Sequence, residues 1–342
     1  MTIREVAAAA ETTIGTVSLA LRGSSRISDA TRERVQRVAN ELGYQPHLPA
    51  RLLREQHPRR IGLIWKVGQE FHEVLLDHLH RLASAHDCEL ITAGTSPAFG
   101  LGEAFSSLVS LRCQSLILID ARPTPEMRKA YPQRGGIVLI GQFPPSGTAT
   151  AITSANDVGM REALAHLAGL GHRSIAYIDG PRGASAKARR ESFERMLAAT
   201  SLAGVVLPGG NDISAGFDSF RRHQDLLISR RVSAVVCYND QCAEGVIIAA
   251  LKAGLRLPED LSVIGTDDST LARSSSLLLT SINKNSSELA ELAFQTALSR
   301  VDQPGDADDP PSARQVVDSY LVVRSSTAPP RSDQRMRADT SS

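Results

Sequence analysis

The sequence offers little material for a metal centre, a disulfide framework or a membrane span. Its 342 residues include four cysteines with no CxxC pair, and no histidine cluster at ligand spacing, so neither zinc nor disulfides are indicated. No signal-peptide core precedes residue 20, and no apolar run approaches about 18 residues. We therefore expect a cytoplasmic protein that binds no metal, no cofactor and no membrane.

Signatures of catalysis are missing as well. No GxGxxG follows a strand, and there is no P-loop, GxSxG or HExxH. His72, His78, His80 and His86 share one segment, but their spacing places them on different faces of a helix. Nothing in the sequence brings a nucleophile and a base together, and we expect a protein that is not an enzyme.

A net charge of +1 conceals a basic N-terminal segment. Up to Arg60 there are ten arginines and six acidic residues, which gives about +4 for this head and about −3 for the remaining chain. A basic head on a mildly acidic body suits contact with phosphates, although a solvated helical face would have the same composition. At 342 residues the chain should hold two or three domains, and 42% hydrophobic residues are enough to build their cores.

Residues 1–45 have the pattern of three short helices. The first opens at Thr2, a tight turn occupies residues 11–13, the second helix begins near Ile14, and the third spans residues 28–42. Seven residues have the spacing of a small core: Val6, Ala10, Val17, Leu21, Val35, Val38 and Leu42. A helix-turn-helix domain lays the start of its second helix in the DNA major groove. A short basic hinge follows at residues 46–57.

After Pro58, short apolar segments alternate with amphipathic ones, a rhythm typical of α/β domains. Expected strands cover residues 61–64, 89–93, 116–119, 137–140, 174–178, 204–207, 234–237 and 262–265, and expected helices cover 71–86, 101–111, 157–169, 187–199, 216–230 and 243–253. Two such series predict two doubly wound parallel sheets, with a ligand in the cleft between the lobes. We assign 58–155 and 285–313 to lobe 1, 156–284 and 314–327 to lobe 2, 301–313 to a surface loop, and 328–342 to a disordered tail.

Ordered matches over about residues 1–327 resemble the lactose/galactose repressor family of bacterial transcription regulators. They include Ile3-Arg4-Glu5-Val6-Ala7, Thr16-Val17-Ser18, Thr31-Arg32-Glu33-Arg34-Val35, Leu42-Gly43-Tyr44-Gln45-Pro46, Leu170-Gly171-His172-Arg173, Asn239-Asp240 and residues 257–265. The resemblance implies a homodimer on a near-palindromic operator, with a hinge helix that inserts Leu53 into the minor groove; a core position for Leu53 is the alternative. The expected DNA contacts are Thr2, Ile14, Gly15, Thr16, Ser18, Leu19, Arg22, His47, Arg51, Leu53 and Arg54.

Three residues depart from the family pattern. Leu19 stands where arginine is usual, and leucine can touch only a thymine methyl or a sugar instead of bonding guanine. Glu11 replaces the usual glycine of the turn, and Pro49 fits only the first turn of a hinge helix. We expect an unusual operator, or weaker binding that is offset by phosphate contacts from Arg22, Arg51 and Arg54.

The body resembles the periplasmic sugar-binding fold, whose lobes close over a small ligand. The family's ligand positions correspond to Lys66, Phe71, Ser185, Arg189, Ile213, Asn239, Asp267 and Lys284. Asp267 could accept two hydroxyl hydrogen bonds, and Arg189 could fork onto ring oxygens or a carboxylate. The alternatives are a loop cap for Asp267 and a surface ion pair for Arg189.

Two details bear on the effector. Ile213 stands where sugar-binding members often have an aromatic platform, which weakens ring stacking. Lys66, Lys284 and Arg189 are three possible cations that would favour a sugar acid or a phosphorylated sugar. The alternative is that both lysines point to solvent. Effector binding would change the lobe angle, the spacing of the paired hinge helices and so the operator affinity. A regulator with a ligand-free cleft is the main alternative; a transport binding protein would have no use for the basic head.

Overall fold

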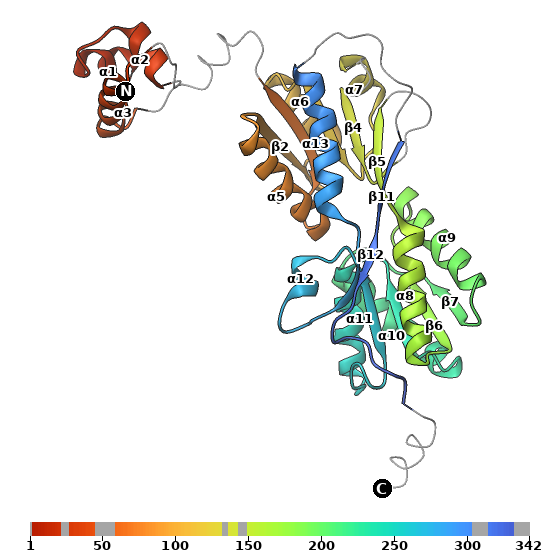
Figure 1. Ribbon diagram of the computed structural model, residues 1–342. Coiled ribbons are helices and arrows are strands. Elements are labelled where there is room, and N and C mark those ends of the chain that lie inside the picture. Colours follow the sequence, from red (N-terminus) through yellow and green to blue (C-terminus); the bar gives the residue numbers. More distant parts are fainter. Residues whose placement is uncertain are drawn as a thin grey trace. The chain divides into compact units, whose positions relative to one another are not determined.

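The computed structural model describes residues 2–21, 27–44, 59–131, 136–142, 149–302 and 314–331 (Figure 1). The chain divides into two compact units, Met1–Pro58 and Arg59–Ser342. Several predictions lie outside the described residues: the hinge at 46–57, the DNA contacts Arg22, His47, Arg51, Leu53 and Arg54, most of the loop, and the tail after residue 331.

The N-terminal unit contains, among its described residues, three helices around a small apolar core. They are α1 (Ile3–Ala9), α2 (Ile14–Leu21) and α3 (Asp29–Glu41). The predicted core is confirmed: Val6, Ala10, Val17 and Val35 are buried, and Leu21, Val38 and Leu42 pack partly buried against them. At the start of α1, the Thr2 amide donates to Oε2 of Glu5 at 2.6 Å. At the start of α3, the Ser28 hydroxyl accepts from the Thr31 amide.

The turn between α1 and α2 requires left-handed backbone at Glu11. Its φ is +47°, which confirms that a residue with a Cβ occupies the place where a glycine would be unstrained. The Thr12 amide closes the turn by donating to the Ala7 carbonyl at 2.9 Å. The helix-turn-helix geometry is thus kept at a local cost of about 1–2 kcal/mol.

Two six-stranded sheets form the second unit, one in each lobe. Lobe 1 has the order β11-β5-β4-β3-β1-β2, all parallel, with β1 (Arg60–Lys66), β2 (Glu89–Thr95), β3 (Ser115–Ile119), β4 (Ile137–Ile140), β5 (Thr150–Ala155) and β11 (Arg314–Asp318). Lobe 2 has the order β12-β10-β9-β8-β6-β7, with β6 (Ser174–Ile178), β7 (Ala203–Leu207), β8 (Ala234–Cys237), β9 (Ser262–Thr266), β10 (Thr280–Asn283) and an antiparallel edge strand β12 (Tyr320–Val322). The predicted pair of parallel sheets is confirmed.

Helices cover both faces of each sheet, which is why the central strands are continuous apolar runs (Figure 1). In lobe 1, α5 (Glu70–Ala85) and α13 (Ser286–Asp302) pack on one face, and α6 (Leu101–Ser110) and α7 (Pro125–Ala130) on the other. In lobe 2, α10 (Ile213–Ser229), α11 (Asp240–Lys252) and α12 (Thr270–Arg273) share one core, and α8 (Asn156–Leu170) and α9 (Ala184–Ala198) the other. Among the described residues, no helix is both long and apolar enough to span a membrane.

The described chain passes between the lobes after β5, after β10 and after β11, and this order corrects the predicted boundaries. Residues 314–318 belong to lobe 1, because β11 pairs with β5 in the register Arg314↔Ala151. Val301, predicted to open a loop, is buried at the end of α13. Residues 328–331 are not a disordered tail: the Ala328 carbonyl lies 3.0 Å from Nε2 of His172.

Candidate functional sites

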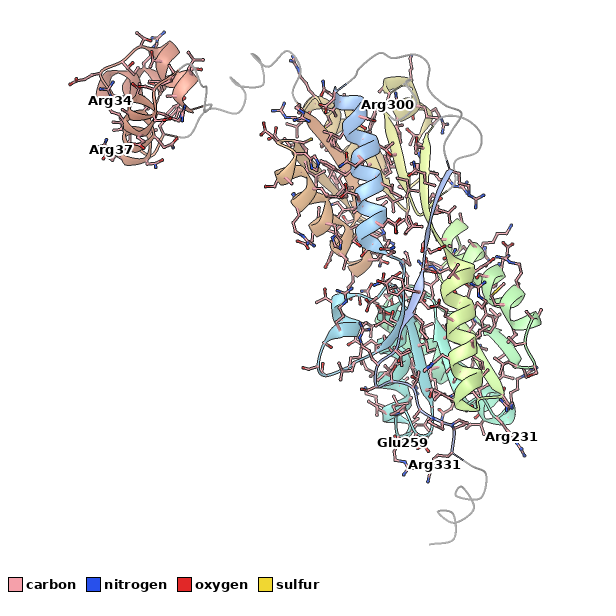
Figure 2. All side chains as sticks on the ribbon, viewed as in Figure 1. Arg34, Arg37, Arg231, Glu259, Arg300 and Arg331 are labelled. Carbon is pink, nitrogen blue, oxygen red and sulfur yellow. The ribbon has the colours of Figure 1, made fainter. Side chains whose placement is uncertain are left out.

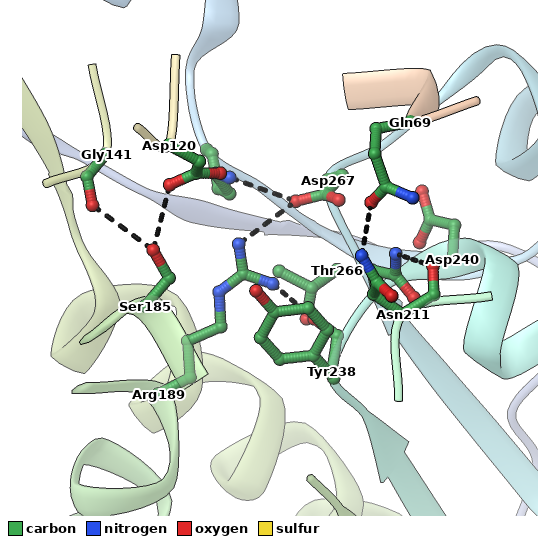
Figure 3. Close-up of polar contacts among 12 residues, drawn as sticks. Gln69, Asp120, Gly141, Ser185, Arg189, Asn211, Tyr238, Asp240, Thr266 and Asp267 are labelled. Atoms are coloured by element: carbon green, nitrogen blue, oxygen red, sulfur yellow. Dashed lines mark hydrogen bonds and ion pairs between the residues drawn. The ribbon is translucent and has the colours of Figure 1, made fainter. Parts of the chain in front are cut away.

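Strand ends bring charged side chains from both lobes together. Asp120 directly follows β3, Asp267 follows β9 and Lys284 follows β10. The backbone φ is +49° at Asp120 and +111° at Asp267, values that cost non-glycine residues about 1–3 kcal/mol and that persist where the surrounding structure holds them. With side chains from α5 and α9 they form the inter-lobe cluster, defined as His72, Asp120, Ser185, Arg189, Asp267 and Lys284; most of it is seen in Figure 3.

Asp267 is the centre of a buried ion triad. Its Oδ1 lies 3.5 Å from Nη2 of Arg189 and 3.2 Å from Nζ of Lys284, and no side chain of the three is more than 8% exposed. Arg189 also donates from Nη1 to the Tyr238 carbonyl and stacks over the Tyr238 ring at 4.2 Å. Nζ of Lys284 lies 3.2 Å from the centroid of the Phe71 ring. Arg189 is therefore not in a surface ion pair, and Lys284 does not point to solvent.

The surroundings of the triad alter the charge that its two cations present to a ligand. Burial lowers the pKa of Lys284 below its ordinary value, and the charge of Arg189 acts in the same direction while Asp267 opposes both. Because Arg189 and Lys284 share one carboxylate, they do not form a free positive pocket. The two buried cations and Asp267 together carry one net positive charge and not two, if all three are ionised.

Asp120 is a site residue that the sequence analysis missed. The Ser185 hydroxyl, in α9 of lobe 2, lies 2.9 Å from Oδ1 of Asp120 and 3.3 Å from the Gly141 carbonyl in lobe 1 (Figure 3). On its other side, Oδ2 of Asp120 lies 3.4 Å from Nε2 of His72. Nδ1 of His72 accepts the Lys66 amide at 3.0 Å, so the ring proton resides on Nε2 and faces Asp120.

These partners keep Asp120 ionised. Burial alone would raise its pKa, but the His72 hydrogen bond and the charge of Lys284 outweigh burial and hold the pKa well below the ordinary value. Gly141, with φ +83°, leaves room for the carboxylate, because a Cβ there would lie 2.4 Å from Oδ1 of Asp120. A polar residue directly after a buried strand was the signal that could have identified Asp120.

Uncharged hydrogen bonds also join the lobes. Nδ2 of Asn211 donates to Oε1 of Gln69 at 2.8 Å, and Nε2 of Gln241 donates to the Gly68 carbonyl at 3.2 Å. Asn239, expected to contact the effector, supports this layer: its Oδ1 accepts the Cys242 amide at 2.9 Å and caps α11, and its Nδ2 donates to the Asn211 carbonyl at 3.0 Å.

The remaining expected ligand positions differ in exposure. Phe71 is buried beneath Lys284, whereas Lys66 is exposed and Ile213 is 39% exposed at the first residue of α10. Of the eight expected effector residues, the structure joins four through side-chain contacts, namely Phe71, Arg189, Asp267 and Lys284. Ser185 connects to Phe71 through Asp120 and His72. Among the described residues, no three potential metal ligands of the His, Cys, Asp or Glu type gather.

A second buried carboxyl, Asp240, lies behind the ion triad. Oδ1 accepts the Ser281 hydroxyl at 2.6 Å and Oδ2 accepts the Ser269 amide at 2.7 Å. Burial, together with the charge of Asp267, raises the pKa of Asp240 to about 7. Gly265 makes room for it, since a Cβ there would lie 2.1 Å from Oδ1.

In the head, α2 presents its first turn and buries its opposite face. Ile14 is 41% exposed and Gly15 is exposed, while Thr16, Ser18 and Leu19 are half-buried beside the buried Val17 and Ala20. The Thr13 hydroxyl accepts the Thr16 amide at 3.1 Å and caps the helix. Arg34 and Arg37 extend from the exposed face of α3 (Figure 2). The head therefore has an exposed first turn on α2 and cationic side chains on the exposed face of α3.

Comparisons with known proteins agree with both units. Residues 2–47 match the bacterial regulatory proteins of the lacI family, and residues 164–327 match a periplasmic binding protein-like domain. The ribose operon repressor of Escherichia coli (strain K12) is 30% identical over 315 residues, covering 89% of this chain and 94% of the repressor.

Two solved structures have the same fold. A LacI transcriptional regulator from a Rhodococcus species is 27% identical, with a TM-score of 0.72 over 80% of this chain and 100% of that one. The lac repressor dimer bound to operator and the anti-inducer ONPF is 22% identical, with a TM-score of 0.73 over 96% and 99% of the two chains. From its helix-turn-helix head, its two-lobed body and these relatives, the chain belongs to the lacI family of bacterial regulatory proteins.

Proposed function

We propose that this protein is a transcriptional repressor that binds a near-palindromic operator as a homodimer and is controlled by a small molecule at the inter-lobe cluster. The observation that carries the proposal is the Asp120–Ser185 contact, because it links a carboxylate of one lobe to a helix of the other beside the Asp267 triad. A ligand that binds these groups acts on the angle between the lobes. As a DNA-binding regulator it would act in the cytoplasm.

The DNA contacts are proposed for α2 and the hinge. Ile14 and Gly15 are exposed at the start of α2, where a recognition helix approaches base edges. Thr2, Thr16, Ser18 and Leu19 would complete the groove contact, and Arg22, His47, Arg51, Leu53 and Arg54 would reach phosphates and the minor groove. Leu53→Ala should weaken operator binding much more than binding to random DNA, measured by fluorescence anisotropy. An equal loss on both DNAs would exclude a wedge role.

The inter-lobe cluster is proposed to bind and not to catalyse. In a serine hydrolase the histidine contacts the serine hydroxyl and the carboxylate lies behind the histidine. Here the Asp120 carboxylate lies between Ser185 and His72, so the imidazole does not receive the hydroxyl proton. Ser185 and His72 instead hold the Asp120 carboxylate in one orientation.

Control of DNA binding follows from linkage. A coupling of about 1–3 kcal/mol between effector and operator would change operator affinity by about 5- to 150-fold, and the operator would change effector affinity by the same factor. The test selects operators from a random DNA pool with the full-length protein and repeats the titration with ribose, the first probe because a relative is a ribose operon repressor. Binding of all DNA sequences with equal affinity would contradict the repressor assignment.

A ligand-independent regulator is the second candidate. It is favoured by Asp267, whose Oδ1 faces both Arg189 and Lys284, and by the Gln69–Asn211 bond, which already joins the lobes. It predicts selective operator binding that no small molecule changes. Effector-dependent operator release would exclude it.

A further inference from the structure

Among the charged side chains of the inter-lobe cluster, Asp120 is the most accessible. Its side chain is 26% exposed, whereas Arg189, Asp267 and Lys284 are 7–8% exposed. Among the described residues, each carboxylate oxygen of Asp120 has one hydrogen-bond partner, Ser185 at Oδ1 and His72 at Oδ2. An ionised carboxylate offers about four acceptor positions, so about two remain for donors from a small molecule.

From this accessibility we propose that Asp120 is a specificity-determining residue. It makes the inter-lobe site take effectors that present a hydroxyl or amine donor to it, and reject effectors that carry a carboxylate or phosphate at that position. The inference rests on the proposed function, since it concerns the effector of that same site, and it names the chemical class of the effector.

The orientation of Asp120 supports this selection. Nε2 of His72 carries the ring proton, because Nδ1 accepts the Lys66 amide, and the ring donates to Oδ2. The Ser185 hydroxyl donates to Oδ1 from the opposite lobe. The carboxylate is therefore held at full charge and can act only as an acceptor.

The surrounding charges do not reverse this preference. Arg189 and Lys284 both lie within 3.5 Å of Asp267, so the four buried or half-buried charged groups comprise two cations and two carboxylates. An anionic ligand group near Asp120 would meet a like charge, with no uncommitted cation among these four groups. Asp120 and Asp267 thus balance Arg189 and Lys284 in number, and Lys66, the third cation expected from the sequence, is exposed and lies outside these four groups.

The experiment compares ligands that share a skeleton but differ in charge. Full-length protein is titrated calorimetrically with ribose, ribonate and ribose 5-phosphate, and with glucose, glucosamine, glucuronate and glucose 6-phosphate. The expected result is that the best neutral or amino ligand binds on the order of 100-fold more tightly than the acid or phosphate of its own skeleton. Tighter binding of an acid or phosphate by the wild type would overturn the proposal.

The variants isolate the charge of Asp120. Asp120→Asn keeps the shape, and its amide oxygen can still accept from His72; it should reduce the preference for neutral over anionic ligands at least about tenfold. Asp120→Gly suits the φ of +49° and provides a second variant should the amide misfold. Asp157→Asn, which removes a carboxylate from a solvent-exposed pair with Arg195, is the matched control and should leave the ratio unchanged.

The outcomes separate the two proposals. An unchanged affinity ratio in folded Asp120→Asn and Asp120→Gly overturns the specificity role of Asp120 and leaves the effector site in place. Binding of none of the seven ligands, in protein that still binds its selected operator, overturns the specificity role together with the effector part of the proposed function.

Discussion

Replacing Asp267 by alanine should destabilise the body strongly, because two buried cations lose their shared counter-ion. Arg189 would keep the Tyr238 carbonyl and Lys284 would keep the Phe71 ring, but neither contact neutralises a charge. Removing one partner of a buried ion pair costs about 3–5 kcal/mol. This is a large part of the 5–15 kcal/mol, in order of magnitude, that stabilises a typical domain.

A double-mutant cycle tests the origin of that loss. Lys284→Met removes one of the stranded cations and keeps an unbranched side chain of similar length. The double variant Asp267→Ala/Lys284→Met should therefore be more stable than the sum of the two single losses by at least about 1 kcal/mol. Asp267→Asn, which keeps the shape, separates loss of charge from loss of packing.

Urea unfolding followed by far-UV circular dichroism and by the fluorescence of Trp65, the single tryptophan, provides the free energies of unfolding. Asp157→Ala is the surface control: its pair with Arg195 is about half exposed, and its loss should cost less than about 1 kcal/mol. A loss in Asp267→Ala no larger than in this control, or additivity of the two site mutations within about 0.5 kcal/mol, would show that Asp267 does not stabilise the two cations.

Three further predictions concern single residues near the inter-lobe cluster. The pKa of Asp240 is raised from 3.8 to about 7 in the folded protein, so its contribution to stability is present at low pH and is lost as pH rises through about 7. Asp240→Asn should therefore remove up to about 4 kcal/mol of the pH dependence of the free energy of unfolding. Parallel pH–stability curves for the wild type and this variant would contradict the prediction. Gly141→Ala should cost about 1–3 kcal/mol more in urea than Gly68→Ala, which meets the same unfavourable φ in open space; equal losses would show that the contact with Asp120 is unimportant. Gln69→Ala should weaken effector binding about two- to tenfold in calorimetry by removing the bond to Asn211, and an unchanged affinity would show that this bond does not hold the lobes together.

Local patterns were sufficient to predict much of the fold. The strands at 174–178, 234–237 and 137–140 were predicted at their observed limits, because each is a short apolar run between turn residues. β5 was missed, since its Thr and Ser residues dilute the apolar signal. β11 was assigned to the wrong lobe, because strand pairing is set by contacts 163 residues apart, as between Arg314 and Ala151, and not by its own sequence.

In the site too, local sequence predicted single residues, and long-range contacts determined how they pair. Asp267, Arg189 and Lys284 were identified through the family resemblance, but their mutual pairing joins elements that are distant in sequence, and no local pattern reports it. The anionic-effector hypothesis counted the two cations without the carboxylate that the fold places between them. Asn239 was expected to bind a ligand, and it also has a capping role that the start of α11 explains. Asp120 was missed because a single acid after a strand is common in loops.

The most direct test of the central claim is the affinity of the full-length protein for its selected operator, measured by fluorescence anisotropy with and without the neutral ligand that binds most tightly. We expect a near-palindromic operator, bound on the order of a thousandfold more tightly than random DNA, and a change of at least about fivefold in that affinity when the ligand is bound. The same operator affinity with and without saturating ligand would contradict control through the inter-lobe cluster.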